Sequence, residues 1–251
     1  MQQPCPHSPI GIKRPMNVLI FQHTPGENPG AFLEHISSNG DTCEIVRLFD
    51  GCPIPVLDDF DLLLVLGGPM DVWETETYPW LATEKQAIRT WVQDLNRPYF
   101  GICLGHQLLV DAMGGKCAPM KQPEIGVLPI KLSDHARRDP LFDTLPGQYR
   151  VLQWHGVEAV ELPPNSTVLA WSNECAVQAF RVSRCAWGVQ FHPELVQGTI
   201  DSWMSDPANY QCAIDWLGSA DAVQTMIMES DKIATEQFEM TSEIFARLRQ
   251  I

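Results

Sequence analysis

The sequence has few basic residues, and this shortage limits the ligands that it can attract. It contains 17 Lys and Arg against 31 Asp and Glu, which gives a formal net charge of -14 at pH 7. A surface field of this sign repels polynucleotides and anionic membrane surfaces. We therefore expect no nucleic-acid partner and no membrane partner, and we interpret the acidity mainly as a contribution to solubility.

Cysteine patterns that bind metals are also missing. The chain has 8 cysteines, but they form no CxxC pair and no Cys/His cluster at the spacing of zinc ligands. Isolated cysteines of this kind are typical of a reducing compartment. The cysteines therefore predict no zinc site, and the chemistry inferred below requires no metal and no organic cofactor.

Long apolar runs are absent from the N-terminal region. Residues 1–15 (MQQPCPHSPIGIKRP) contain no apolar h-region, and the apolar run at 18–21 is too short for a signal peptide or a membrane span. We interpret residues 1–15 as a tail and expect a cytoplasmic protein. With 251 residues and no internal repeat, the chain fits one large domain with a short appendage.

Strand-like and helix-like segments alternate in the first half of the chain. Apolar runs that are typical of strands buried on both faces occur at 18–21, 43–49, 62–66 and 98–103, and helical patterns occur at 31–38, 80–95 and 105–113. This order predicts an α/β fold with an open, mostly parallel sheet flanked by helices. Further strand-like runs follow at 126–132, 149–154, 167–171, 176–182 and 186–191.

The last 50 or so residues differ from the rest. Residues 210–217 and 222–251 lack turn dipeptides and proline, and the segment from Asp201 carries 3 basic and 9 acidic residues. We therefore divide the chain into a tail at 1–15, a domain at 16–199 and a helical appendage at 200–251. The simplest interpretation packs this appendage on the sheet with an acidic face in solvent, and a helix that docks a partner is the alternative.

The sequence GICLG at 101–105 is the clearest sign of chemistry. It places Cys103 between a buried strand and a helix, where a sharp turn forces the nucleophile outward and flanking glycines allow close backbone approach. The helix N-terminus also stabilises a thiolate. Without this context Cys103 would be interpreted as a buried apolar residue; within it, we predict a nucleophile.

The sequence FHPE at 191–194 supplies a base and a group to orient it. In an extended segment residues i and i+2 project to the same side, so the Glu194 carboxylate can reach the His192 ring while its other nitrogen faces Cys103. A thiol nucleophile needs such a pair. Taken alone, His192 could instead be a histidine at a strand end with its hydrogen bonds satisfied, and Glu194 a solvated carboxylate.

An oxyanion hole needs two N–H donors near the reacting carbonyl. The backbone N–H of Leu104, directly after the nucleophile, is one candidate. Gly68 is the other, because Gly67-Gly68-Pro69 follows a strand and can present a backbone N–H at the crevice where open α/β sheets bind ligands.

At this point the sequence resembles the class I, triad-type glutamine amidotransferases. The resemblance rests on LGGPMDVWETETYPWL at 66–81, GICLGHQLLVDAMGG at 101–115, LQWHG at 152–156 and GVQFHPE at 188–194. It covers about residues 16–195 and is strongest to stand-alone proteins related to the amidotransferase domain of GMP synthase, a group that includes γ-glutamyl peptidases.

The resemblance implies a flavodoxin-like sheet with an added antiparallel portion. It also implies that Cys103 is the nucleophile, His192 the general base and acid, and Glu194 the orienting carboxylate, with Gly68 and Leu104 as oxyanion donors. Gln107, Gln153, Trp154 and His155 match positions that line the glutamine pocket in the family. The alternative interpretation of Gln107 is a polar residue in the first turn of a helix without a role in binding.

The implied reaction is hydrolysis of the γ-glutamyl amide of glutamine, with a self-sufficient γ-glutamyl peptidase or hydrolase as the alternative. The chain after Glu194 has no P-loop and no SGGxDS-type pyrophosphatase loop. ATP and XMP binding therefore have no basis in this sequence, and delivery of ammonia to a synthase partner stays open.

Cysteine-elbow proteins of the intracellular protease type are a second enzyme class, but the FHPE motif, whose His192 lies 89 residues after Cys103, favours the amidotransferases. A protein that only binds γ-glutamyl ligands would normally have lost a triad residue.

Overall fold

The computed structural model describes residues 14–251, so the predicted tail at 1–15 lies almost entirely outside the described residues. One nine-stranded sheet forms the centre, in the order β2-β1-β3-β4-β9-β8-β7-β5-β6. Its first part is parallel and consists of β2 (Thr42–Arg47), β1 (Asn17–Gln22), β3 (Leu62–Val65), β4 (Tyr99–Ile102) and β9 (Ala186–Val189). The parallel sheet predicted from the alternating pattern is confirmed.

The second part of the sheet is antiparallel and continues from β9. It consists of β8 (Ala179–Val182), β7 (Thr167–Trp171), β5 (Lys116–Leu132) and β6 (Gln148–Glu161). β5 and β6 form a long ribbon whose register shifts between Pro119 and Glu124. These two strands are much longer than the predicted runs at 126–132 and 149–154. The prediction was too short because Pro119, Pro123 and several polar residues obscure the alternation of apolar and polar residues in the outer halves of the strands.

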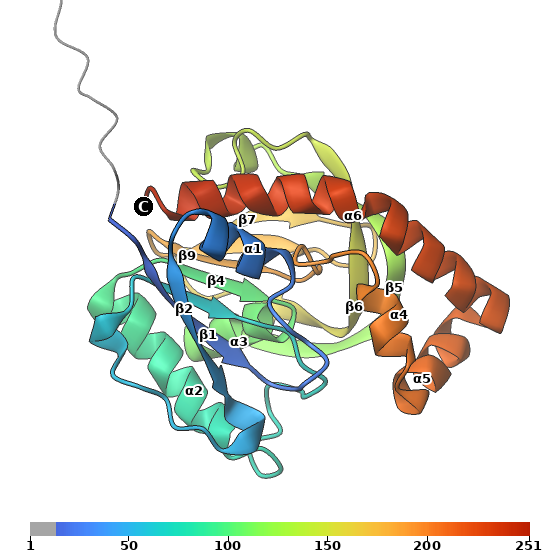
Figure 1. The fold of residues 1–251 in the computed structure, drawn as a ribbon, viewed down its shortest axis with the longest axis horizontal. Coiled ribbons are helices and arrows are strands. Elements are labelled where there is room, and N and C mark those ends of the chain that lie inside the picture. Colours follow the sequence, from blue (N-terminus) through green and yellow to red (C-terminus); the bar gives the residue numbers. More distant parts are fainter. Residues whose placement is uncertain (1–13) are drawn as a thin grey trace, which may run out of the picture.

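Helices cover both faces of the sheet (Figure 1). The helices are α1 (Ala31–Ser38), α2 (Trp80–Arg89), α3 (Leu104–Ala112), α4 (Thr199–Met204), α5 (Pro207–Leu217) and α6 (Ala220–Leu248), and short 3-10 turns occupy Leu48–Asp50, Leu57–Asp59 and Ala136–Arg138. The predicted helix at 80–95 is α2 together with a π-helical extension, Thr90–Leu95. No helix in the described part of the chain is both long enough and apolar enough to cross a membrane.

Strand β1 shows how the sequence divides the core between the two faces. Val18 and Ile20 pack on the side of α1 and α6, and Leu19 and Phe21 pack on the side of α2 and α3. Because successive side chains of a strand point to opposite faces, an uninterrupted apolar run is needed to fill both layers. Burial of each such side chain contributes about 1.5–3 kcal/mol.

The strand order also fixes the position of the cavity described below. Strand β1 lies between β2 and β3, so the chain leaves β1 toward α1 on one face and leaves β3 toward α2 on the other. The two departing loops, at 23–30 and 66–79, therefore diverge at the carboxyl edge of the sheet. This is the point at which open α/β sheets form their ligand crevice.

The segment after residue 199 packs against the body of the protein. On α6, residues Met240, Ile244, Phe245 and Leu248 join the core on the α1 face, and Arg249 pairs with Asp41 at 2.7 Å. The start of α6 instead packs with α4, α5 and Ile200 in a separate apolar cluster. The division of the chain at residue 199 into domain and appendage stays a prediction.

Substitution of Gly105 by alanine should destabilise the fold. A Cβ at this position would stand 2.9 Å from the carbonyl carbon of Val65, which belongs to the backbone and cannot rotate away. We expect a loss of about 1–3 kcal/mol or more, as for overpacked cores, seen as a lower urea midpoint with an unchanged slope. Gly147→Ala is the matched control, because its Cβ would meet only an arginine side chain at 3.6 Å. Equal midpoints for the two variants would contradict this account.

Candidate active site

Cys103 occupies a strained turn between β4 and α3. Its φ is 51° and its ψ is -103°, in a region that non-glycine residues rarely adopt. The turn is held by hydrogen bonds from Cys103 N to Val189 O at 2.8 Å and from Gly105 N to Leu66 O at 3.1 Å. Such a backbone costs on the order of 1–3 kcal/mol and persists only when its surroundings impose it. The turn places the thiol at the N-terminus of α3 and at the edge of a cavity.

His192 and Glu194 lie just beyond the end of β9. His192 N donates to Leu152 O at 2.9 Å, and Ala31 N donates to Glu194 O at 3.0 Å, so both residues are fixed by the backbone of neighbouring segments. The Glu194 Oε1 and His192 Nδ1 atoms are 2.7 Å apart, as the i, i+2 spacing predicts. The approach of Glu194 to α1 depends on Gly30, where φ is 51° and a Cβ would overlap the Glu194 carbonyl.

The electrostatic surroundings of His192 favour its charged form. Burial lowers the pKa of the ring, but the Glu194 carboxylate and the neighbouring Cys103 sulfur outweigh burial and raise the pKa of His192 well above its usual value. The other ring nitrogen, His192 Nε2, has no hydrogen-bond partner of ordinary geometry among the described residues. The Glu194 carboxylate therefore stabilises a proton on the His192 ring.

The two predicted oxyanion donors lie next to each other. A Cβ on Gly68 would stand 2.8 Å from Leu104 Cδ2, which places the loop after β3 against the first residue of α3. Leu104 begins its helix, so its N–H has no partner within that helix. The oxyanion role of both residues stays a prediction.

A buried histidine that the sequence analysis missed supports this loop. His23 Nδ1 lies 2.7 Å from Gly67 O, and His23 Nε2 lies 2.9 Å from Glu84 Oε1 on α2. Burial lowers the pKa of His23, but Glu84 outweighs burial and the net direction is upward. The pair thereby fixes the Gly67 carbonyl, and its only sequence signal was a histidine directly after a strand.

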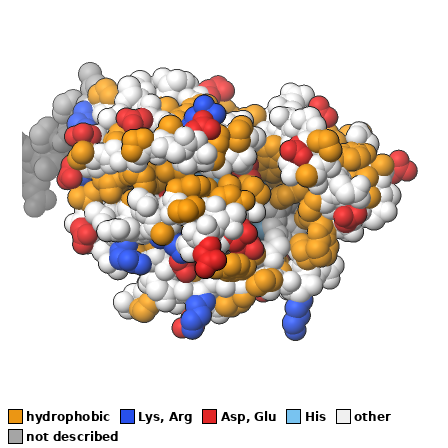
Figure 2. Space-filling model, turned by 90° about the horizontal axis from the view of Figure 1, so that it is seen from below, with side chains coloured by type: hydrophobic (Ala, Val, Ile, Leu, Met, Phe, Trp, Pro, Cys, Tyr) orange, Lys and Arg blue, Asp and Glu red, His pale blue; other side chains and the backbone are white. Residues whose placement is uncertain are grey.

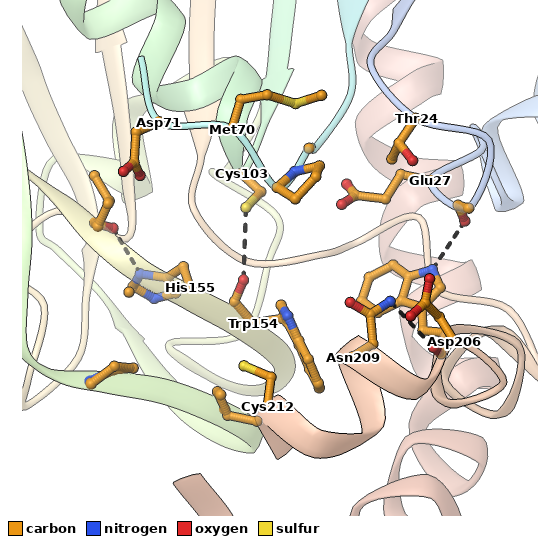
Figure 3. A pocket seen from close by; sticks show the side chains of 18 of the residues that line it. Thr24, Glu27, Met70, Asp71, Cys103, Trp154, His155, Asp206, Asn209 and Cys212 are labelled. Atoms are coloured by element: carbon orange, nitrogen blue, oxygen red, sulfur yellow. Dashed lines mark hydrogen bonds between the residues drawn. The ribbon is translucent and has the colours of Figure 1, made fainter. Parts of the chain in front are cut away.

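A cavity of about 910 Å³ opens beside Cys103. Figure 3 shows Cys103 between Glu27 and Thr24 on one side and Asp71 and His155 on the other. Helix α5 forms a further wall through Asp206, Asn209 and Cys212. On the surface, a hollow separates the body of the protein from the lobe that carries α5, with hydrophobic side chains on its borders (Figure 2).

The residues predicted to bind substrate do not all reach this cavity. Gln107, Trp154 and His155 line it, together with Gly68 and Cys103. Gln107 Nε2 donates to Gln190 Oε1 at 3.3 Å, and Trp154 O lies 3.9 Å from Cys103 Sγ. Gln153 is fully buried and is not among the lining residues.

Three further residues near Cys103 were missed by the sequence analysis. Gln190 Nε2 lies 3.7 Å from Cys103 Sγ. The ring of Trp203, on α4, meets the His192 ring edge-on at 5.0 Å between centroids. Glu27 has a buried Oε2 atom without a hydrogen-bond partner among the described residues, and burial raises the pKa of this carboxyl to about 7. Glu27 follows a Thr-Pro-Gly turn, so only the fold reveals its proximity to His192.

One buried set of residues has the chemistry of metal ligands. Glu124, His155 and Cys175 are separated in sequence, but their ligand atoms lie within 4.8 Å of one another. Burial raises the pKa of the Cys175 thiol to about 12, and Glu124 Oε2 already accepts from Gln178 Nε2 at 2.6 Å. Glu124 Oε2 also lies 3.2 Å from His155 Nε2. Gln178 thus holds the Glu124 carboxylate beside the ring of His155, which lines the cavity.

Comparisons with known proteins agree with this geometry. The profile of the family glutamine amidotransferase class-I matches residues 31–206. The glutamine amidotransferase-like protein YfeJ of Salmonella typhimurium is 31% identical over 203 residues, which cover 78% of this chain and 84% of that protein. A subunit of the glutamine-hydrolysing GMP synthase of Pyrococcus abyssi is 40% identical over 103 residues, which cover 41% of this chain and 53% of that protein.

Solved structures share the fold. A glutamine amidotransferase of Thermotoga maritima superposes with a TM-score of 0.84 at 24% identity and covers 94% of this chain and 99% of its own. A glutamine amidotransferase of Methylobacillus flagellatus gives a TM-score of 0.81 at 25% identity, with 94% and 95% coverage. The similarity therefore extends beyond residue 199 into the C-terminal helices.

Removal of the Glu194 carboxylate should lower the pKa of His192. In Glu194→Gln the ring stays buried but loses its largest charge-stabilising neighbour, so its titration midpoint should fall. The midpoint is measured by NMR of the histidine ring. Glu124→Gln, which removes a carboxylate beside His155 instead, should leave the His192 midpoint unchanged. An unchanged His192 midpoint in Glu194→Gln would refute this electrostatic assignment.

Replacement of Glu27 by glutamine should stabilise the protein at alkaline pH. Burial raises the pKa of the Glu27 carboxyl from its ordinary value of 4.5 to about 7 in the folded chain, so the folded state loses stability as pH rises between these values. We expect Glu27→Gln to be more stable than the unmodified protein by about 1–3 kcal/mol at pH 8 and about equal at pH 4. Thermal unfolding at both pH values measures this, with Glu34→Gln, on the exposed face of α1, as the control. A stabilisation that does not change with pH would contradict the assignment.

Proposed function

Because the chain belongs to the class I glutamine amidotransferase family, we propose that it hydrolyses the γ-glutamyl amide of glutamine to glutamate and ammonia. The observation that carries the proposal is the 2.7 Å contact between Glu194 and His192 at a cavity that holds the strained Cys103. A nucleophile, a base and a group that orients the base are the minimum for acyl transfer. No cofactor is part of the proposal.

In the proposed reaction the Cys103 thiolate adds to the side-chain carbonyl, and the N–H groups of Gly68 and Leu104 bind the oxyanion. The C–N bond then breaks, and protonated His192 donates its proton to the leaving amine. The γ-glutamyl thioester on Cys103 is attacked by water, which His192 deprotonates. Cleavage of the C–S bond releases glutamate and restores the thiolate. Gln107, Trp154 and His155 hold the γ-glutamyl portion in this proposal.

A γ-glutamyl hydrolase that acts on larger conjugates is the second candidate. The observation that favours it is the cavity of about 910 Å³, which continues from Cys103 to α5. This volume is close to the upper end of the range for drug-sized ligands, about 300–1,000 Å³. Glutamine alone would leave much of the space to water.

The acceptor of the ammonia and the location of the protein are further parts of the proposal. The similarity to a GMP synthase subunit makes a synthase partner the first candidate acceptor. The cysteines in the described part of the chain are all free, which supports a cytoplasmic location.

Release of glutamate from glutamine and from γ-glutamyl amides tests the proposal. The isolated protein should release glutamate, and Cys103→Ser should lose activity by at least about 10³-fold, because a serine hydroxyl at this position has no comparable anionic form. Cys52→Ser, at an exposed position away from the cavity, is the control and should retain full activity. Glutamate release that is equal in Cys103→Ser and Cys52→Ser would overturn the proposal. Turnover of glutamine alone would favour a glutaminase subunit, and faster turnover of conjugates would favour the hydrolase.

A further inference from the structure

One side of the cavity is built around His192 by segments from opposite ends of the chain. Trp203 Nε1 donates to Gly26 O at 3.1 Å, which joins α4 to the loop that carries Glu27. Asn209 Nδ2 donates to Trp203 O at 3.2 Å and joins α5 to the same wall. Because Trp203 contacts the His192 ring, this wall faces the group that protonates the leaving amine in the proposed function.

The cavity lining carries carboxyl groups but no basic lysine or arginine side chain among the described residues. The carboxyl groups belong to Glu27, Asp71 and Asp206. Glu27 stands nearest to the reacting groups, since a Cβ on Gly67 would meet both its Oε2 atom and His192 Cε1. Asp206 uses Oδ1 to cap α5 through Ala208 N at 2.8 Å.

Glu27 has the properties of a ligand group rather than a structural one. Its Oε2 atom is buried without a hydrogen-bond partner among the described residues, which is costly for a carboxylate. Trp154, Trp203 and Trp216 add aromatic surface to the same cavity, and aromatic faces attract cations. A positively charged group would compensate all of these features, whereas a carboxylate would be repelled by them.

We propose that the side of the cavity between Glu27 and α5 is a subsite for a positively charged amine, so that the substrate is a γ-glutamyl amide of a diamine or a similar cationic amine. This inference rests on the proposed function for the cleavage itself. The second ammonium group of the amine lies against Glu27 and Asp206, with Trp203 beside its methylene chain. Glu27 is then a specificity-determining residue, and the leaving amine departs along α5.

Four amides of γ-glutamate test the proposal: the 4-aminobutyl amide, the neutral pentyl amide, the conjugate of 4-aminobutyrate, and glutamine. We expect kcat/KM to fall about tenfold or more from the cationic to the neutral amide, and again to the anionic one. Glu27→Gln and Asp206→Asn should each reduce the ratio of cationic to neutral turnover by about fivefold to tenfold. Asp215→Asn removes the same charge from α5 outside the cavity lining and should leave the ratio unchanged.

The pH dependence of this ratio separates a specificity role from a structural one. The pH dependence of the cleavage step that both amides share cancels in the ratio. The Glu27 carboxyl, which faces His192, Glu194 and His23, has its pKa raised to about 7 by burial, so the ratio should rise between pH 6 and pH 8. In Glu27→Gln the ratio of cationic to neutral turnover should not change with pH.

Binding of the amides to the inactive Cys103→Ser protein distinguishes a failure of the subsite proposal from a failure of the proposed function. Tighter binding of the 4-aminobutyl amide than of the neutral and anionic amides, measured by calorimetry, supports the subsite even without turnover. Absence of turnover for all four amides would overturn the proposed function alone. Equal binding and equal turnover of the cationic and neutral amides would overturn the subsite.

Discussion

The turn at Cys103 is the constraint on which the rest of the site depends. A positive φ at a residue with a side chain is unfavourable, so the surrounding backbone must leave no alternative. Val189 on β9 and Leu66 after β3 supply the hydrogen bonds that do this, and both strands are neighbours of β4. The same packing brings the loop after β3 against Leu104 and the segment after β9 against the thiol. One backbone conformation thereby places three separate parts of the chain around one sulfur atom.

Charge burial in this site opposes stability and serves chemistry. His192 and Glu194 compensate each other, because a proton on the ring is stabilised by the carboxylate. Glu27 is compensated less well, because burial outweighs its attraction to His192 and His23 and raises the pKa of its carboxyl to about 7. Such a residue is expected where binding, rather than folding, has determined the side chain. The residues that conflict with local stability, Cys103 and Glu27, both line the cavity.

Much of the fold followed from the sequence because its signals are local. The helix at 31–38 and the strand β1 were placed closely, since an apolar run and an Asn-Gly stop need no tertiary information. The long ribbon of β5 and β6 was underestimated, because its outer halves are stabilised by pairing with each other rather than by alternation of apolar residues. The contact of Glu194 with His192 was predictable from an i, i+2 spacing. The positions of Glu27, Trp203 and Asp206 depend on contacts between residues about 180 positions apart, such as Trp203 with Gly26, and no local pattern contains that information.

The sharing of the cavity between the two ends of the chain has a consequence for synthesis on the ribosome. Cys103, His192 and Glu194 have all been translated once residue 194 is reached, but the wall that contains Trp203 and Asp206 is added afterward. This wall packs in turn against α6, and Arg249 directly after α6 pairs with Asp41. A nascent chain therefore contains Cys103, His192 and Glu194 before it contains the wall that we propose as a subsite. On the subsite that we propose, selectivity would follow the docking of α6.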